Sequence, residues 1–480
     1  MEAKKRNVLM ISYYFPPSGG SGVLRMVRYI SNILQYGWKP FVITIDARDL
    51  DKIAYGTVNR DESFAGIEKT VEILRVRSRR PSYALTMLGR PIKGAWQAVG
   101  SRVLPSRSAR PRAQSKTKDH SDGGPTATET VSSATHGQGP RISVLGRISR
   151  FFFDFIIIVD QLFEWSVPAI CRGVPFVRRN KISCIFSSSP PWSVHIIALF
   201  LKRLCRKRWV MDLRDPIYGI SGDGRKRSRS FLIESFNKSL EKLLIRNADV
   251  VVCNCEEIRE YYRQRYEKKR FEVILNSYDQ NDFVRGIEKR KGRDRIIIRY
   301  VGELYETIRT PDAFLRASAE LLREEPMLKE KLSIAFIGER RYFQLPVFQN
   351  LLAALELQAI VQTEGYVPHR AAIIAMQESD ALLLLQPHES TRYQVPAKLY
   401  EYIAAGNPIL AIAPTGSATY NIVKRYGLGT VNDPNDMAGI KQSIRDAIAG
   451  NVPMPPRAVV EEFSAARMTK KLVDIMESLQ

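Results

Sequence analysis

The sequence predicts an α/β protein with two consecutive doubly wound parallel sheets, and three observations indicate this fold. Short runs of Val, Ile and Leu alternate with amphipathic helical stretches along both halves of the 480-residue chain. Most of these runs are continuously apolar, as parallel strands covered on both faces are. A charged stretch without apolar periodicity, at 282–295, separates the halves. Repeated strand–helix units of this kind are typical of Rossmann-like sheets.

Thirteen strands and several helices follow from this pattern. The expected strands of the first half are Asn7–Tyr14, Pro40–Ile45, Val71–Val76, Ile182–Ser187, Trp209–Leu213, Asp249–Cys253 and Glu272–Leu275. Those of the second half are Ile296–Tyr300, Leu332–Ile337, Ile360–Glu364, Ala381–Gln386, Pro408–Ile412 and Gly429–Val431. The clearest helices are Gly22–Tyr36, Ser193–Leu204, Phe231–Asn247 and Thr310–Arg323.

Two domains are expected, over residues 1–290 and 291–480, with the last helix packing back on the first domain. Residues 101–146 are rich in Ser, Thr, Gly, Pro and Arg and almost empty of aromatic residues. Such a composition supplies too little apolar surface to fold, so we expect a disordered or mobile insert there. Strands resume at Ile182, and the insert therefore interrupts the first domain without ending it.

Composition excludes several classes of protein. With 44% hydrophobic residues the chain is not disordered throughout, and no stretch approaches the ~20 apolar residues of a membrane span. The five cysteines are odd in number and scattered, which predicts neither a disulfide framework nor, from Cys253 and Cys255 alone, a zinc site. The N-terminus has no signal-peptide pattern, and we expect a reducing, cytoplasmic location.

The charge is distributed unevenly. The chain has 73 Lys and Arg against 50 Asp and Glu, a net charge of +23. From Ile296 onward there are 19 basic and 21 acidic residues, so 1–295 carry 54 and 29, a net of +25. Such a field attracts a polyanion, and an anionic membrane surface fits better than nucleic acid, for which no recognition motif is present. A merely solvated basic face is the plainer alternative.

A glycine loop follows the first strand, in the segment Tyr13–Arg25, whose sequence is YYFPPSGGSGVLR. Gly19, Gly20 and Gly22 let backbone amides approach a ligand, and the helix that begins there favours anions. The spacing matches neither the dinucleotide fingerprint nor a P-loop, so a phosphate-related role and an ordinary turn both remain open.

Charged residues also follow the strand in WVMDLRDPIYG, Trp209–Gly219, where Asp212, Arg214 and Asp215 come before Pro216. The carboxyl ends of parallel strands line the ligand crevice, so these side chains are candidates for a site. The alternative is a structural ion pair, such as Arg214–Asp215, that fixes the loop. His195, early in a predicted helix, is either a cleft residue or a core residue.

The segment RYQVPAKLYEYIAAGNPILAI, Arg392–Ile412, gives the strongest signal. A helix begins after Pro396 and ends at Gly406, and it carries Lys398 and Glu401 three residues apart on one face. The two side chains form either part of a ligand site or an ordinary helical salt bridge.

These three segments, in this order, resemble the retaining glycosyltransferases of the GT-B fold, specifically group 1 (family 4). Further matching pieces are Ser187–Arg203, Ala248–Tyr262, Val273–Phe283, Tyr300–Pro311 and Glu364–Leu385. The resemblance implies two Rossmann-like domains that face each other across a cleft. It also implies a nucleotide-sugar donor as substrate, with neither a cofactor nor a metal.

Site residues carry over one by one. The resemblance implies that Glu401 binds the nucleotide ribose and that Arg309 and Lys398 neutralise the departing diphosphate. It also implies that the glycine loop closes on the donor. Asp215 is a further catalytic candidate. Arg214, Asp212 and His195 are candidates for the acceptor side of the cleft.

The sequence departs from the family pattern in three places. Tyr393 stands where many members place a second glutamate, eight positions before Glu401, and Glu389 or His388 are candidate substitutes. Glu303 stands after Gly302, where the family usually has an arginine. Arg214-Asp215 stand near the place of a histidine that many members carry.

The function that this resemblance implies is transfer of a sugar from a nucleotide-sugar to an acceptor, expected to be lipid-linked or a glycan. The setting would be polysaccharide or glycolipid biosynthesis, by a metal-independent retaining enzyme at the cytoplasmic face of a membrane. One alternative is a nucleotide-sugar epimerase or hydrolase of the same fold. Another is a catalytically degenerate homologue that binds membranes or nucleic acid through its basic half.

Overall fold

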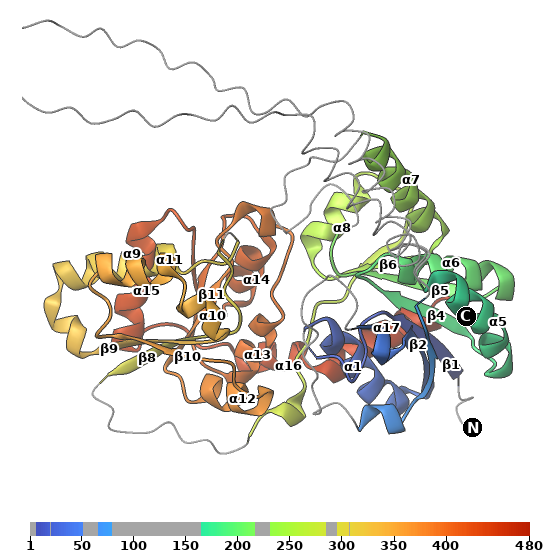
Figure 1. Ribbon diagram of the computed structural model, residues 1–480, viewed down its shortest axis with the longest axis horizontal. Helices are drawn as coiled ribbons and strands as arrows, with labels where there is room; N and C mark the ends of the chain where they lie inside the picture. The colour runs from blue at the N-terminus through green and yellow to red at the C-terminus, as the bar shows by residue number, and fades with distance from the viewer. Residues whose placement is uncertain are drawn as a thin grey trace, which may run out of the picture. The chain divides into compact units, whose positions relative to one another are not determined.

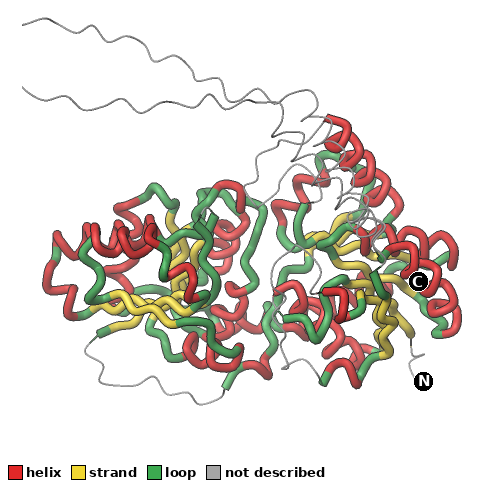
Figure 2. Tube along the Cα trace, viewed as in Figure 1, coloured by secondary structure: helices red, strands yellow, loops and turns green. Residues whose placement is uncertain are grey.

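The structure is a computed structural model that describes residues 6–19, 21–50, 66–78, 165–216, 231–284, 295–306 and 308–480. The thirteen described strands form two sheets, one of seven strands and one of six, and all their pairings are parallel. Both sheets belong to one compact unit, Met1–Arg79 with Gln161–Gln480. The predicted insert at 101–146 lies outside the described residues. All thirteen predicted strands are present, so the predicted α/β class is confirmed (Figures 1 and 2).

The first sheet has the strand order β3-β2-β1-β4-β5-β6-β7. Its strands are β1 (Arg6–Ser12), β2 (Trp38–Ile45), β3 (Glu72–Val76), β4 (Cys184–Ser188), β5 (Arg208–Leu213), β6 (Val250–Cys253) and β7 (Phe271–Val273). Its longer helices are α1 (Ser21–Ile33), α5 (Ser166–Arg179), α6 (Ser193–Cys205), α7 (Phe231–Asn247) and α8 (Glu256–Arg263). The order reverses beside β1, which places a ligand-binding crevice at the carboxyl end of that strand.

The second sheet has the order β10-β9-β8-β11-β12-β13 and reverses beside β8. Its strands are β8 (Ile296–Val301), β9 (Leu332–Ile337), β10 (Val361–Glu364), β11 (Ala381–Leu385), β12 (Ile409–Ile412) and β13 (Gly429–Asn432). Its helices are α9 (Asp312–Glu324), α10 (Arg340–Phe343), α11 (Pro346–Ala354), α12 (His369–Gln377), α13 (Lys398–Ala405), α14 (Ala418–Tyr426) and α15 (Met437–Ala449).

Helices cover both faces of each sheet, and the strand sequences show why. In β11, Leu382 and Leu384 pack into one apolar cluster while Leu383 and Leu385 pack into another. Successive side chains of a strand point to opposite faces, so a strand that is apolar at every position needs cover on both. The residues of β1 divide between two clusters in the same way. These runs therefore explain the two-sided cores.

The last two helices are α16 (Arg457–Glu462) and α17 (Ala465–Glu477), and α17 packs against elements of the first sheet. Helix α17 contacts α1, and Met468 and Leu472 share an apolar cluster with residues of β1 and β2. Two backbone hydrogen bonds join the same region: Tyr278 N donates to Phe463 O (3.1 Å) and Ala465 N to Tyr278 O (2.9 Å). The chain thus ends against its own first sheet.

Three further features bear on chemistry. In the described part of the chain, no helix combines the length and hydropathy needed to cross a membrane. Within the same residues, no group of three or more His, Cys, Asp or Glu side chains is placed to hold a metal ion. All five cysteines are free thiols, and Cys253 and Cys255 are buried. For Cys253 and Cys255 this burial raises the pKa above that of an ordinary thiol.

Candidate functional site

Two cations meet at the carboxyl edge of the second sheet. Lys398 begins α13, and Arg309 follows a short loop after β8 that is closed by paired backbone bonds between Tyr305 and Arg309. Gly302, directly after β8, and Gln386, directly after β11, complete the group. Strands β8 and β11 are neighbours, so their ends bring together residues that are far apart in the sequence.

The ammonium group of Lys398 is held at the end of β8. Its Nζ donates to the Tyr300 hydroxyl (2.8 Å) and lies 4.0 Å from the centre of the same ring. Gly302 has φ +129°, and a Cβ there would collide with Nζ and lie 3.0 Å from Cε of Lys398. The close approach of this lysine therefore requires glycine at 302.

Burial lowers the pKa of Lys398 well below its ordinary value, and the nearby charge of Arg309 lowers it further. The carboxylates of Glu401 and Glu303 act in the opposite direction. Protonation of Lys398 therefore costs free energy in the empty site, and an anion beside it would offset that cost. The site is therefore suited to a ligand with negative charge.

Arg309 is oriented by an amide from the neighbouring strand. Its Nε and one terminal nitrogen both donate to Oε1 of Gln386, at 3.3 and 3.1 Å. Gln386 is only 1% exposed, and its Nε2 has no hydrogen-bond partner among the described residues. A buried donor without a partner is costly, and a ligand oxygen would satisfy it. Sequence reasoning missed Gln386, because a Gln after an apolar strand carries no motif.

Glu401, three residues after Lys398, is paired within the protein. Its Oε1 accepts from Arg28 of α1 at 3.2 Å, and its side chain is 9% exposed. Arg28 also donates to the carbonyl of Ser277 and lies 3.9 Å from Asp282. Asp282 in turn lies 3.5 Å from Nε2 of His369, and this nearby carboxylate raises the pKa of His369. Oε2 of Glu401 has no recorded partner among the described residues and is the atom available to a ligand.

The glycine loop of the first sheet lies against Arg214. One terminal nitrogen of Arg214 donates to the carbonyl of Gly22 (3.1 Å), and its buried Nε has no partner among the described residues. Burial raises the pKa of Asp215 against the opposing effect of Arg214. Gly19 is partly buried just before α1, and Gly20 lies outside the described residues.

Asp212, expected from the sequence on the acceptor side of the cleft, is instead buried in an ion pair. Its two carboxylate oxygens accept from Nε (3.0 Å) and a terminal nitrogen (2.7 Å) of Arg25, and Oδ2 also accepts from Ser188 (2.6 Å). Its side chain is fully buried, and Arg25 reaches on to the carbonyls of Ile274 and Leu275. Asp212 is therefore the centre of a structural ion pair, and a different one from the Arg214–Asp215 pair considered above.

His195 is a core residue and not a cleft residue. It is fully buried, and its Nδ1 lies 2.8 Å from the hydroxyl of Ser187, which also accepts from the indole of Trp209 (2.8 Å). Burial lowers the pKa of His195 to about 3, so the ring stays neutral. The expectation that it faces an acceptor is corrected by this burial.

Neither candidate substitute for the missing glutamate approaches the cationic pair by a recorded contact. Glu389 is paired with Arg392, and Nδ1 of His388 bonds the Ser390 hydroxyl (2.7 Å). Both interactions are local and exposed. At the position itself, the Tyr393 ring packs edge-on against Tyr261, with ring centres 5.8 Å apart.

Comparison with known proteins agrees with this geometry. Residues 282–462 match the family model described as glycosyl transferases group 1. The cationic pair lies inside this group 1 segment. A curated relative, D-inositol 3-phosphate glycosyltransferase of Thermobifida fusca, is 24% identical over 217 residues, which is 42% of this chain. The chain spans about half the length of that relative (48%).

Solved structures share the whole architecture. Sucrose-phosphate synthase from Thermosynechococcus elongatus aligns over 99% of both chains, with a TM-score of 0.56 and 12% identity. Anabaena HepE in complex with UDP aligns over 98% of this chain and 100% of its own, with a TM-score of 0.58 and 13% identity. A glycosyltransferase from Rickettsia africae aligns with this protein over 99% of each of the two chains, with a TM-score of 0.58 and 12% identity. The predicted GT-B fold is therefore confirmed for the chain that contains the group 1 segment.

Proposed function

We propose that this protein is a glycosyltransferase that moves a sugar from a nucleotide-sugar donor to an acceptor hydroxyl. One observation carries the proposal: Lys398 and Arg309 lie at the carboxyl edge of the second sheet, within the group 1 segment, beside Gln386, whose Nε2 has no partner among the described residues. Two cations and a free donor suit a diphosphate group. HepE, which has the same fold, was solved with UDP and with UDP-glucose.

The chemistry follows from the charges. The bond between the sugar's anomeric carbon and the diphosphate oxygen breaks, and the diphosphate leaves with both bonding electrons. An acceptor hydroxyl bonds to the anomeric carbon and loses its proton, for which Asp215, with its raised pKa, is the candidate base. Cations placed at the leaving oxygens lower the barrier because negative charge grows there in the transition state. Arg309 can grip two oxygens while Lys398 acts as a point charge.

We further propose that the reaction is retaining and independent of a metal, with the cations of Arg309 and Lys398 taking the negative charge that develops on the leaving group. Glu401 would bind the ribose hydroxyls through Oε2. Gly19, Gly20 and Gly22 would approach the donor through backbone amides. Arg214, which donates to the Gly22 carbonyl and whose Nε has no partner among the described residues, would link this loop to the reacting groups.

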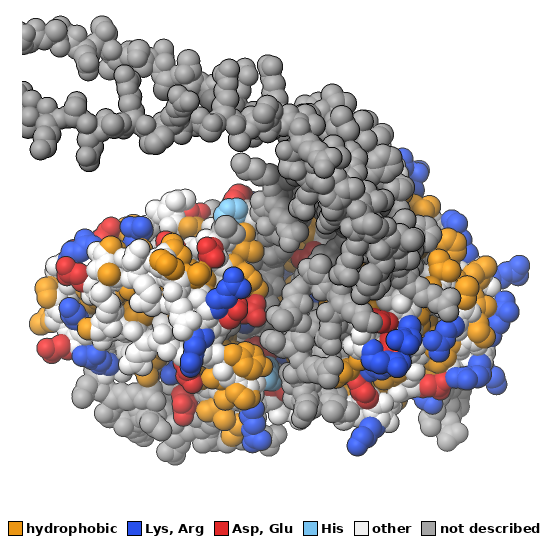
Figure 3. Space-filling model, in the orientation of Figure 1, with side chains coloured by type: hydrophobic (Ala, Val, Ile, Leu, Met, Phe, Trp, Pro, Cys, Tyr) orange, Lys and Arg blue, Asp and Glu red, His pale blue; other side chains and the backbone are white. Residues whose placement is uncertain are grey.

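The acceptor is proposed to be lipid-linked, in polysaccharide or glycolipid biosynthesis at the cytoplasmic face of a membrane. The charge of +25 on residues 1–295 supports this. So do four exposed apolar side chains on two helices of the first sheet that contact each other: Phe200 and Leu204 of α6 and Phe236 and Leu243 of α7, all 44–52% exposed. Figure 3 shows apolar and basic side chains side by side on this part of the molecule. Such a surface suits a peripheral contact with anionic lipid.

Donor turnover with and without a lipid-linked sugar acceptor tests the proposal. A transferase releases nucleoside diphosphate at a rate that rises with acceptor and forms a glycosylated lipid. Acceptor-independent conversion of the donor would instead favour the epimerase or hydrolase alternative. The matched control is the Arg309→Gln/Lys398→Gln double variant, which should lower kcat more than it raises KM.

A further inference from the structure

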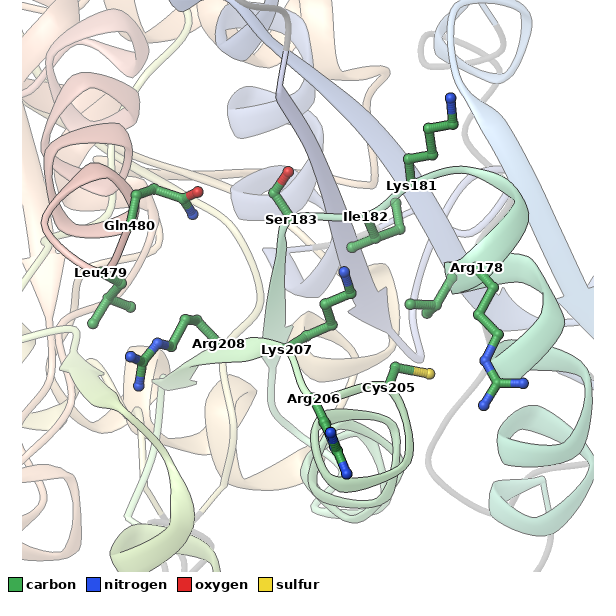
Figure 4. A pocket seen from close by; sticks show the side chains of 11 residues that line it. Arg178, Lys181, Ile182, Ser183, Cys205, Arg206, Lys207, Arg208, Leu479 and Gln480 are labelled. Atoms are coloured by element: carbon green, nitrogen blue, oxygen red, sulfur yellow. The ribbon is translucent and has the colours of Figure 1, made fainter.

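A second cationic site lies at the opposite, amino edge of the first sheet. A pocket of about 620 Å³ opens there, between the ends of two helices and the starts of two strands. Its lining includes no Asp or Glu side chain but five cations: Arg178, Lys181, Arg206, Lys207 and Arg208. Leu479 and Gln480, the last two residues of the sequence, also line it. Figure 4 shows the five cations around the starts of β4 and β5: Lys207 extends toward Ile182 and Ser183, and the ends of Arg178, Lys181, Arg206 and Arg208 point outward in different directions.

Of the five pocket cations, only Arg208 has a recorded ion pair with a described residue. Arg208 shares Asp249 with Lys202, at 3.3 and 2.5 Å. The structure records no ion pair with a described residue for the other four cations of the pocket. Like charges gathered around one space repel each other, and an anion in that space would relieve the repulsion.

The backbone at two of these residues gives an independent indication. Only three non-glycine residues of the described chain have a positive φ: Lys181 (48°), Arg206 (52°) and Glu356 (56°). Each of the three follows the end of a helix. The backbone N–H of the residue after it donates to the carbonyl five residues earlier: Ile182 N donates to Val177 O (3.1 Å) and Lys207 N to Lys202 O (3.1 Å). Glycine is the ordinary residue in this left-handed position, because other side chains are strained there.

Elsewhere the chain uses glycine in this motif. Helix α14 ends at Gly427, with φ 60°, and carries its cations Lys424 and Arg425 in the preceding turn. Cations are attracted to the negative end of a helix. In α14 the two cations reach that end from the last helical turn, and a glycine takes the left-handed position, so this attraction does not require a strained backbone. At α5 and α6 a lysine and an arginine occupy the strained position itself, and both line the same pocket. Strain kept at such places is typical of ligand clamps.

We propose that this pocket binds a phosphate group, with Lys181, Arg206 and Lys207 as its principal ligands. The phosphate belongs either to a free anion or to the headgroup of an anionic lipid, and the two sources share the chemistry that the pocket recognises. The site is separate from the cationic pair of Lys398 and Arg309, which lies on the second sheet.

The test uses the full chain with Lys398→Gln and Arg309→Gln, so that the second-sheet site does not bind the probe. In this background we expect pyrophosphate, at fixed ionic strength, to raise the melting temperature. Adding Lys181→Gly and Arg206→Gly should weaken pyrophosphate binding about tenfold or more, since two charged ligands are lost. The same change should raise the melting temperature without pyrophosphate, because strain and repulsion are both removed.

Two controls separate charge from backbone strain. Glu356→Gly relieves the third strained position and should raise the melting temperature without changing the response to pyrophosphate. Arg323→Gln with Lys329→Gln removes two exposed charges from the second half and should leave that response unchanged. Lys207→Gln removes a ligand from an unstrained position and should weaken pyrophosphate binding even if the glycine variant folds poorly.

A vesicle arm distinguishes the sources. Sedimentation with phosphatidylglycerol and phosphatidylcholine vesicles compares the same variants. The pocket is assigned to a lipid headgroup if the pocket variants lose only their binding to phosphatidylglycerol vesicles and the Lys398→Gln/Arg309→Gln parent shows no response to pyrophosphate. It is assigned to a free anion if the pocket variants lose the response to pyrophosphate that the parent shows. If the glycine variant and Lys207→Gln match the charge control in both arms, the proposal is overturned.

Discussion

The Nζ of Lys398 occupies the space that a side chain at Gly302 would need, at the end of the central strand of the second sheet. This relationship joins two residues 96 positions apart in the sequence. It explains why a lysine on α13 can stand beside the end of β8, where Glu303 leaves the neighbouring loop position without a cation.

Gly302→Ala should therefore lower donor turnover by roughly a hundredfold, as expected when a catalytic group is displaced by about 1 Å. The added methyl group collides with Lys398 and is also strained at φ +129°. Steady-state kinetics with a competent donor measure the effect. Gly406→Ala is the matched control, since that glycine also has a positive φ (72°) but nothing within 4 Å of its Cβ position; equal losses of turnover in the two variants would contradict the account.

Binding of a nucleoside diphosphate should be coupled to uptake of a proton by Lys398. The folded protein holds the pKa of this lysine well below its ordinary value, and a bound anion raises the pKa again. Calorimetry at about pH 8.5, where the phosphate is fully ionised, in buffers of different ionisation enthalpy measures the uptake.

Lys398→Arg should bind the diphosphate without this proton uptake, because arginine remains charged. Equal uptake by the wild type and the arginine variant would show that the proton goes elsewhere. For folding the sign is the reverse of binding: a lysine whose pKa is lowered on folding costs stability at neutral pH. That cost fades as the pH rises toward lysine's ordinary pKa.

Glu401→Gln should reduce kcat/KM for the donor by about ten- to a hundredfold, the effect of losing a charged hydrogen bond of about 1.5–3 kcal/mol. The amide oxygen still accepts from Arg28, so the melting temperature should change little. Arg28→Gln serves as the comparison. It should lower the melting temperature by more than Glu401→Gln does, and it should lower kcat/KM by less. Normal donor kinetics in Glu401→Gln would remove Glu401 from the donor site.

His195→Phe should leave the kinetics for donor and acceptor unchanged and make the protein less sensitive to acid. The pKa of about 3 in the folded state lies below the ordinary 6.5, so the unfolded chain binds a proton that the folded chain rejects. Stability is therefore lost as pH falls from about 6.5 toward 3, by up to 1.36 kcal/mol per pH unit. Melting temperatures of the two proteins across this range measure the difference, and an altered acceptor KM would argue for a cleft position after all.

The strands were predictable because each is a short apolar run bounded by turn residues, and the local pattern alone determines them. The ion pairs were not, because Arg25 and Asp212 are 187 residues apart and Arg28 and Glu401 are 373 apart. Whether Asp212 faces a cleft or an arginine depends on which helix crosses the end of β5, and no local pattern records that. Lys398 could be proposed from its local motif. Gln386 could not, because its contact with Arg309 arises only from the pairing of β8 with β11 in the folded sheet.

The most direct test of the central claim is nucleotide binding at the cationic pair. Melting temperatures are measured with UDP, GDP, ADP and dTDP for the wild type and for Arg309→Gln/Lys398→Gln. A ligand that binds only the folded state raises the melting temperature, so at least one nucleotide should stabilise the wild type and have little effect on the double variant. If no nucleotide stabilises the wild type, or if the double variant responds equally, this pair does not bind the donor.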